Sequence, residues 1–130
     1  MPAWMLDTVA LIDYYHGRHG VLPYLEAILE GKTSGAFSTI TELELWQGIR
    51  VGEEERHEAL LALLERVPLD GAIARRAAQL RQQVGLERLS LPDAAIAASA
   101  ELNGCTLLTR NTRDFETLDE LLAIEFYSNE

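Results

Sequence analysis

The sequence predicts an α/β protein, a three-layer α/β/α sandwich with a mainly parallel central sheet. Short apolar runs alternate with longer segments of helical periodicity along the 130 residues. Strands that are separated by helices need crossover connections, which produce parallel pairing and helices on both faces of the sheet. An Ala-rich helical segment at 94–100 fits this arrangement, because small side chains let a helix approach the sheet closely. We expect residues 1–130 to form one domain.

Strands are predicted where a short apolar run ends at polar or turn-forming residues. The first such run is followed directly by Asp7, and the second leads into a Ser/Thr-rich segment. The predicted strands are 3–6, 35–39, 105–108 and 124–127, with a further short extended piece at 67–69 around Pro68.

Helices are predicted where apolar residues recur at intervals of three and four. The segment 53–67 has the plainest pattern, with Leu or Val at four positions spaced i, i+3, i+4 and i+7. Gly85 and the pair Asn103-Gly104 stand where helices should end. The predicted helices are 8–16, 22–29, 41–51, 53–67, 73–84 and 92–103, with a short helical turn after Asn111.

Composition excludes several classes of protein. With 48% hydrophobic and 25% charged residues the chain is not intrinsically disordered, and no apolar stretch approaches the roughly 20 residues that span a bilayer. Cys105 is the one cysteine, which excludes an internal disulfide, and it is expected to be a small core residue. The first residues carry no basic region, so we expect no secretory signal, no membrane association and a cytoplasmic protein.

The net charge of −10 is unevenly distributed. Residues 66–113 hold 7 basic groups, all of them arginine, against 4 acidic ones, whereas the flanking segments are strongly acidic. Arginine suits phosphate recognition because its planar guanidinium can donate two hydrogen bonds at once. The average charge therefore argues against nucleic acid, but its distribution does not.

Carboxylates follow several of the predicted strands. Asp7 comes directly after the first strand, Asp114 follows the strand 105–108, and Asp93 opens the Ala-rich helix. Glu42 or Glu44 would join them from the helix after the second strand. Ligands of open parallel sheets bind at the carboxyl ends of the strands, and carboxylates that gather there repel one another unless a cation intervenes. Hard oxygen ligands of this kind suit Mg²⁺ or Mn²⁺.

Helix capping is the competing interpretation of these acids. The spacings Thr41-x-x-Glu44, Ser90-x-x-Asp93 and Asn111-x-x-Asp114 resemble capping boxes, and an acid in a first helical turn needs no metal to explain it. Glu42 and Glu44 differ by about 200° on a helix, so at most one faces the other acids. With Thr41 as N-cap, Glu44 stands at the third helical position and Leu43, Trp46 and Ile49 lie near the core. We therefore favour Glu44.

Four blocks of the sequence, at 6–13, 41–48, 91–98 and 108–115, resemble the motifs of PIN-domain ribonucleases, and more narrowly those of VapC-type toxins. The blocks occur in order over about residues 5–127. The family pattern T-x-x-E-L-x-x-G falls on Thr41, Glu44, Leu45 and Gly48, which favours Glu44 independently. The resemblance implies a PIN-like fold over residues 1–130.

The resemblance also implies the chemistry. Asp7, Glu44, Asp93 and Asp114 would bind Mg²⁺ (or Mn²⁺) and catalyse hydrolysis of single-stranded RNA, leaving a 5′-phosphate and a 3′-hydroxyl. Accessory polar groups would come from Thr8, Thr109 and Asn111, and the candidates for contact with RNA phosphates are Arg110 and Arg113. A toxin of this kind has a cognate antitoxin, whose basic C-terminal segment would occlude the acidic groove, and it forms a homodimer, with helices near residues 8–30 as the expected contacts.

Other chemistries find less support in the sequence. His57, among four glutamates, is expected at the surface, and a metal site at His16 and His19 is disfavoured because histidines in a Gly-flanked loop are usually solvated. A phosphoacceptor receiver domain needs a lysine near its last strands, but Lys32 precedes the second strand. A phosphatase of the haloacid dehalogenase type needs Asp-x-Asp after the first strand, which is absent here. A PIN-like binding module without catalysis remains open.

Overall fold

The computed structural model describes residues 2–130 and contains a five-stranded sheet whose neighbouring strands are all parallel. The strands are β1 (Trp4–Leu6), β2 (Gly35–Ser38), β3 (Glu65–Val67), β4 (Thr106–Thr109) and β5 (Ile124–Phe126). Their order across the sheet is β3-β2-β1-β4-β5, so that β1 lies at the centre. The predicted parallel sheet is confirmed.

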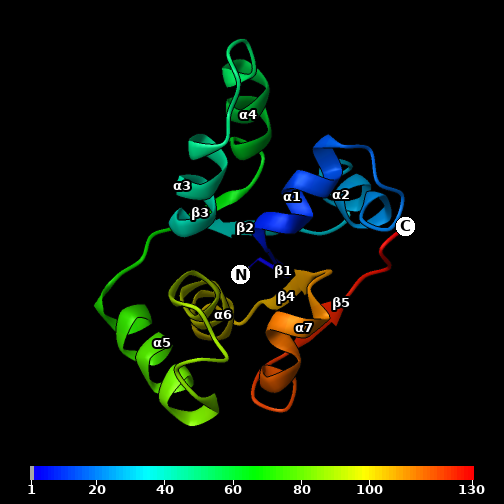
Figure 1. Cartoon of the computed structure of the whole chain (residues 1–130). Helices are drawn as coiled ribbons and strands as arrows, with labels where there is room; N and C mark the ends of the chain where they lie inside the picture. The colour runs from blue at the N-terminus through cyan, green and yellow to red at the C-terminus, as the bar shows by residue number, and fades with distance from the viewer. Residues whose placement is uncertain (1) are drawn as a thin grey trace.

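Helices cover both faces of the sheet, which confirms the three-layer sandwich (Figure 1). One face carries α1 (Thr8–Tyr15), α2 (Leu22–Leu29), α3 (Thr39–Gln47) and α4 (Glu54–Leu61). The other carries α5 (Gly71–Val84), α6 (Leu91–Leu102) and α7 (Thr112–Phe115), followed by a 3₁₀ turn at Glu116–Leu118. Within residues 2–130 no helix has the length and hydrophobicity that a bilayer crossing requires.

The two faces have separate hydrophobic cores because successive side chains of a strand point to opposite sides. Met5 and Leu107 pack with α5, α6 and α7, whereas Leu6, Phe37 and Leu108 pack with α1 to α4. All five are fully buried. The alternation fixes which residue stands at the carboxyl end of each strand and on which side it emerges.

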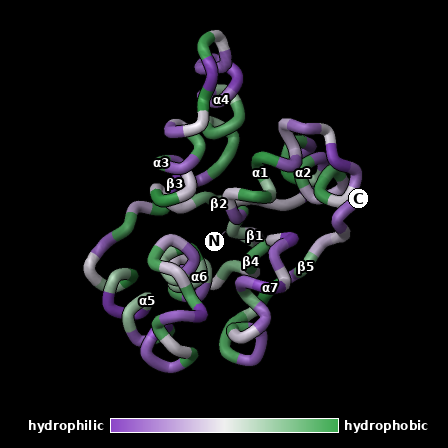
Figure 2. Tube along the Cα trace, viewed as in Figure 1, coloured by the Kyte–Doolittle hydropathy of each residue, from purple (hydrophilic) through white to green (hydrophobic). Residues whose placement is uncertain are grey.

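Helix α6 is the most deeply buried helix of the fold. Every residue from Ala94 to Ala100 is buried, and the helix packs against α5, α3 and three strands. Such contact on several sides requires side chains no larger than a methyl group at most positions, as the sequence analysis expected. By contrast α5 alternates between hydrophobic and hydrophilic positions along its turns (Figure 2), because only the stripe of Ile73, Ala77 and Leu80 faces the core. Helix α6 therefore places its N-terminal Asp93 with little freedom.

The predicted helix 53–67 is wrong in its second half. Helix α4 ends at Leu61, and residues 65–67 form β3, which pairs with β2 in the register Ala36 to Glu65 and Ser38 to Val67. Sheet pairing prevails over helical periodicity here because it satisfies the backbone groups along the open edge of β2. Leu63, placed by the periodicity on a buried stripe, is 62% exposed in the turn between the two elements.

The predicted start of α3 is also wrong. The helix begins at Thr39, and its N-cap is Ser38, whose hydroxyl accepts a hydrogen bond from the Ile40 N–H at 3.0 Å. Thr41 is instead a buried residue of the first turn, and Leu43, expected near the core, is 61% exposed. The serine at the strand end caps the helix at once, so no connecting residues separate β2 from α3.

A buried ion pair links the first and last parts of the fold. The Asp13 carboxylate, 1% exposed, accepts hydrogen bonds from Arg110 Nε at 2.7 Å, Arg110 Nη2 at 3.1 Å and the Tyr127 hydroxyl at 2.6 Å. Burial on its own would raise the pKa of Asp13, but the hydrogen bonds from Arg110 and Tyr127 outweigh it and lower the pKa. This network joins α1 to the segments after β4 and β5.

We expect Asp13→Ala to lower the free energy of unfolding by about 3 kcal/mol at pH 7, because it leaves the half-buried Arg110 without its partner. The pKa of Asp13 is lowered by folding, so its contribution is present above the unfolded pKa and is lost as the pH falls through the folded one. Urea denaturation measures the change. The control is Glu30→Ala, whose ion pair with Lys32 is exposed and should contribute less than about 0.5 kcal/mol. Equal losses for both variants would contradict the assignment.

Candidate active site

Asp7 occupies the carboxyl end of the central strand and is 3% exposed. Its side chain accepts a hydrogen bond from the Thr109 hydroxyl, at the end of the neighbouring strand β4, at 2.8 Å. The Asn111 N–H donates in turn to the Thr109 oxygen at 3.1 Å. Asp7 is also the residue before α1, although its side chain makes no capping hydrogen bond. Its carboxylate is therefore free of the capping role and turned toward β4.

Burial raises the pKa of Asp7 to about 7. The hydrogen bond from Thr109 opposes this rise, while the negative charges of Asp93 and Glu44 add to it. Two of the predicted acids are thus close enough to Asp7 to disfavour its ionisation. Such repulsion between carboxylates is the electrostatic condition under which a site attracts a cation.

Glu44 lies on α3 and faces the start of α1. The Thr8 hydroxyl donates to Glu44 Oε1 at 2.6 Å and lies 3.1 Å from the Thr41 hydroxyl. The alternative acid, Glu42, points elsewhere: Arg66 on β3 donates to it through Nε at 2.8 Å and Nη2 at 3.0 Å. The two glutamates diverge as the helical phase predicted, and the side chain beside Asp7 is that of Glu44.

Asp93 and Asp114 approach the same edge from two helices on the other face. Each stands at the third position of its helix, after the N-cap residues Ser90 and Asn111. Burial raises the pKa of Asp93, a hydrogen bond with Ser90 opposes the rise, and the charges of Asp114 and Glu44 add to it. All four predicted acids are therefore brought to one edge of the sheet.

The capping interpretation has a different outcome at each helix. It is confirmed for Ser90, whose hydroxyl accepts from the Asp93 N–H at 3.2 Å. It is wrong for Thr41, because Ser38 caps α3 and Glu44 lies beyond the first turn. Asn111 makes no side-chain capping bond to α7. Capping therefore explains the position of Asp93 but not those of Glu44 and Asp114. It also does not explain why these three acids lie at the same edge as Asp7.

The donor set fits Mg²⁺ or Mn²⁺ in chemistry, since it consists of carboxylate oxygens whose charges repel one another. In the arrangement of residues 2–130, however, no three acidic, His or Cys side chains stand close enough together to form a ready set of ligands. Asp7 and Asp93 are held by burial and by the fold, whereas the Glu44 side chain is exposed. Any closing of the set around a cation therefore falls first to the exposed Glu44 side chain.

The two arginines of the fourth block differ in their surroundings. Arg110 is engaged by Asp13 in the buried ion pair described above, so its guanidinium serves the fold. Arg113, in the first turn of α7, is exposed beside Asp114. Of the two candidates for phosphate contact, Arg113 has its guanidinium at the surface.

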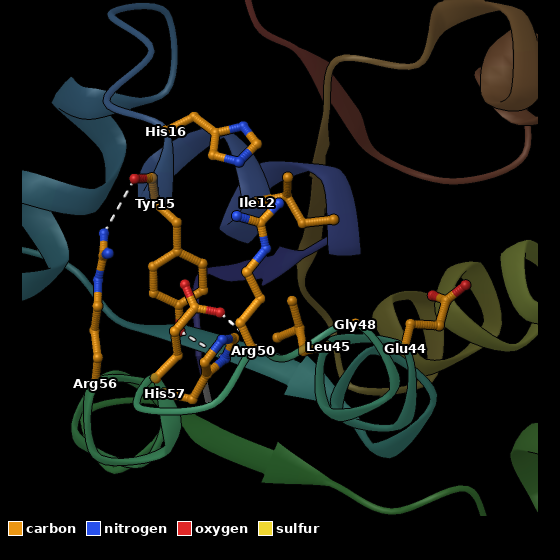
Figure 3. Close-up of a pocket in the computed structure, with 10 residues that line it drawn as sticks. Ile12, Tyr15, His16, Glu44, Leu45, Gly48, Arg50, Arg56 and His57 are labelled. Atoms are coloured by element: carbon orange, nitrogen blue, oxygen red, sulfur yellow. Dashed lines mark hydrogen bonds between the residues drawn. The ribbon is translucent and has the colours of Figure 1, made fainter.

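A pocket beside Glu44 includes residues that the sequence analysis placed wrongly or did not consider (Figure 3). His57, expected at the surface, is 7% exposed, because its ring packs 4.5 Å from that of Tyr15 and its Nδ1 lies 3.1 Å from the Tyr15 hydroxyl. Its buried position on α4 could have been found from the helical phase, since His57 lies three and four residues before Leu60 and Leu61. Arg50 and Arg56, which also line the pocket, lie outside the four sequence blocks, so no motif pointed to them.

Comparisons with known proteins agree with this geometry. The PIN domain family model matches residues 4–121. A toxin-antitoxin complex from Klebsiella pneumoniae is 35% identical, covers 87% of this chain and 90% of its own, and has a TM-score of 0.75. FitAcB from Neisseria gonorrhoeae is 26% identical, with 93% and 95% coverage and a TM-score of 0.75. A DNA-bound VapBC from Salmonella typhimurium shares the fold, with 24% identity, 97% and 98% coverage and a TM-score of 0.79. A search of curated proteins finds no match.

The chain therefore belongs to the PIN domain family. Its resemblance to VapC-type toxins is confirmed as well, since the Klebsiella pneumoniae structure, 35% identical, is a toxin-antitoxin complex. Proteins of this kind are typically ribonucleases, and PIN domains typically use divalent metal ions.

We expect Asp7→Asn to stabilise the metal-free protein at neutral pH. Folding raises the pKa of Asp7 from 3.8 to about 7, so the ionised carboxylate disfavours folding above pH 7, and this penalty disappears below the unfolded pKa. Asparagine removes it, with a gain of up to about 4 kcal/mol at pH 8 that vanishes near pH 4. Urea denaturation in EDTA at both pH values measures the change.

The matched control is Glu42→Gln. Hydrogen bonds from Arg66 lower the pKa of Glu42, so removing this charge should weaken the fold at pH 8. A loss of stability for Asp7→Asn at pH 8, or an equal effect at both pH values, would show that Asp7 is not under electrostatic strain.

Proposed function

We propose that this protein is a metal-dependent endoribonuclease that cleaves single-stranded RNA as the toxin of a toxin-antitoxin pair. In this proposal residues 1–130 act as one PIN-like domain, and Asp7, Glu44, Asp93 and Asp114 are both the catalytic residues and the ligands of Mg²⁺ (or Mn²⁺). One observation carries the proposal: four carboxylates from separate parts of the chain lie at one edge of the sheet, where burial and the charges of neighbouring acids raise the pKa values of Asp7 and Asp93.

The chain's own residues would divide the work according to their burial. Asp7 and Asp93, fixed by β1 and by α6, set the position of the site, and Thr109 orients the Asp7 carboxylate through its hydrogen bond. Thr8 holds Glu44 near that carboxylate, and Asp114 completes the acidic edge. A divalent cation bound there would supply a water of lowered pKa and neutralise charge on the scissile phosphate. Without such a cation, the acidic edge would repel RNA.

The partner that we propose is an antitoxin with a basic C-terminal segment. The Klebsiella pneumoniae structure, 35% identical over most of this chain, is a toxin-antitoxin complex, and a protein with a net charge of −10 suits a basic partner. Arginine or lysine side chains of that segment would lie among the four acids. A homodimer with contacts near residues 8–30 and action in the cytoplasm, where RNA is accessible, complete the proposal.

We expect the purified chain to cleave a mixed pool of single-stranded RNA in Mn²⁺ or Mg²⁺ but not in EDTA. Asp7→Asn and Asp93→Asn should each lower cleavage by at least about 100-fold, because they remove charge from the proposed metal ligands. Gel analysis of end-labelled RNA measures the rate and the chemistry of the new ends. Full cleavage by both variants would overturn the assigned site.

The adjacent glutamates provide the matched control for this experiment. Glu44→Gln and Glu42→Gln are the same chemical change two residues apart, but Glu44 faces Asp7 and Thr8 whereas Glu42 is paired with Arg66. Cleavage should be lost with the first and retained with the second. Loss with both, or with the second alone, would contradict the assignment of Glu44.

Binding of the cation can be measured without RNA. Millimolar Mn²⁺ should raise the melting temperature of the wild-type chain, by roughly 10 °C if the ion is about 100-fold above its dissociation constant. Glu42→Gln should show the same rise, and Asp93→Asn a much smaller one. An unchanged melting temperature for the wild type would favour a PIN-like binding module without catalysis.

A further inference from the structure

The pocket of Figure 3 opens directly beside the proposed site. It has a volume of about 360 Å³ and lies between α1, α3 and the segment that leads into α4, and Glu44 forms part of its wall. Arg50 and Arg56 line it, with His16 at its rim. Figure 3 shows the Arg50 side chain extending toward α1, between His16 and Ile12, while the Glu44 carboxylate extends from α3 on the opposite side.

The arginines of this pocket differ in their surroundings from the arginines that form ion pairs in the fold. Carboxylates engage four arginines in ion pairs, namely Arg18, Arg66, Arg76 and Arg110. In the described part of the chain, neither Arg50 nor Arg56 has such a pair. Arg56 donates to the Tyr15 carbonyl at 3.0 Å and lies 4.7 Å above the Tyr15 ring, which fixes its guanidinium at the wall.

The nearby acids do not neutralise these arginines by direct contact. Glu53 accepts a hydrogen bond from the backbone N–H of Arg50 at 2.8 Å, and Glu54 accepts one from the N–H of Gly52 at 3.0 Å. Both carboxylates are thus used to shape the loop before α4. Both guanidiniums therefore line the pocket without a carboxylate partner among the described residues, that of Arg56 from its position against Tyr15.

We propose that this pocket binds a phosphodiester group of the single-stranded RNA that flanks the scissile one, with Arg50 and Arg56 as its contacts. The inference rests on the proposed nuclease function and adds a substrate subsite to it. A guanidinium can donate two hydrogen bonds to one phosphate group, and phosphate contacts position a nucleic acid without reading its sequence.

The position of the pocket favours RNA over an acidic peptide. A polyanion that crosses the four acids must leave the edge of the sheet on one of its two sides. Arg113 on α7 is exposed on the face of α5 to α7, and Arg50 and Arg56 lie on the face of α1 to α4. Exposed arginines thus flank the acidic edge on both sides, as a strand passing over the site requires.

The test compares Arg50→Ala with Lys32→Ala. Lys32 is an exposed cation before β2, at the opposite edge of the sheet, so both variants lose one positive charge. For Arg50→Ala we expect KM for single-stranded RNA to rise about 10-fold with little change in kcat, and the salt dependence of RNA binding in EDTA to weaken by about 0.7 in its logarithmic slope. For Lys32→Ala we expect neither change.

A second variant tests the sign of the electrostatic effect. Glu53→Gln retains a side-chain oxygen for the Arg50 N–H but removes a negative charge from the pocket, so it should bind a fluorescein-labelled RNA more tightly, by about 2-fold to 3-fold. Because Arg56 also contacts Tyr15, Arg56→Gln is interpreted together with its melting temperature. We expect weaker RNA binding together with a lower melting temperature, because the contacts with Tyr15 are lost. Unchanged RNA binding would exclude Arg56 from the subsite.

The outcomes separate this inference from the function on which it rests. Cleavage that responds to Arg50→Ala no more than to Lys32→Ala would overturn the subsite and leave the nuclease standing. RNA binding that depends on Arg50, in a wild-type chain that does not cleave, would support the subsite and overturn the nuclease. Weaker binding of the antitoxin with unchanged RNA binding would assign the pocket to a protein partner and overturn the proposal.

Discussion

The burial of one carboxylate at the end of the central strand is the constraint around which the site is organised. Asp7 follows β1, which has a hydrophobic core on each face, so its carboxylate has almost no contact with water. Hydrogen bonding by the Thr109 hydroxyl and the Thr8 backbone replaces the lost hydration only in part, and the pKa rises to about 7. Each further acid that the fold brings to this edge adds to an electrostatic penalty that a cation would relieve.

Four acids of this protein form two pairs whose pKa values the fold moves in opposite directions. Asp13 and Glu42 each receive two hydrogen bonds from one arginine, and their pKa values are lowered. Asp7 and Asp93 have no arginine, and their pKa values are raised by burial and by other carboxylates. Environments that move the pKa values of similar groups apart distinguish structural acids from candidate functional ones. Because Arg110 and Arg66 are paired with Asp13 and Glu42, they do not neutralise the acids at the edge of the sheet.

Local patterns in the sequence predicted the structure correctly where a single interaction determines it. The Ala-rich segment predicted α6 and its depth, and the helical phase separated Glu44 from Glu42. The sequence was insufficient where distant segments compete for the same residues. Pairing with β2 converted the end of a regular helical repeat into β3, and Ser38 capped α3 before Thr41 could. The burial of Asp13 depends on Tyr127 and Arg110, which no local pattern connects to it.

The net charge of −10 and a polyanionic substrate become compatible once the position of each charge is considered. Attraction between a surface and RNA depends on charges within about 8 Å at physiological salt, so distant acids contribute little. The acidic C-terminal segment is screened by distance, and the ion-paired acids are already neutralised by their own partners. Neither group therefore cancels the attraction between RNA and the arginines that flank the site. Arg113 on one face and Arg50 and Arg56 on the other could hold the backbone on either side of the acids. The carboxylates between them would then contact RNA only through a bound cation. Productive binding of RNA would therefore require that the metal site is occupied.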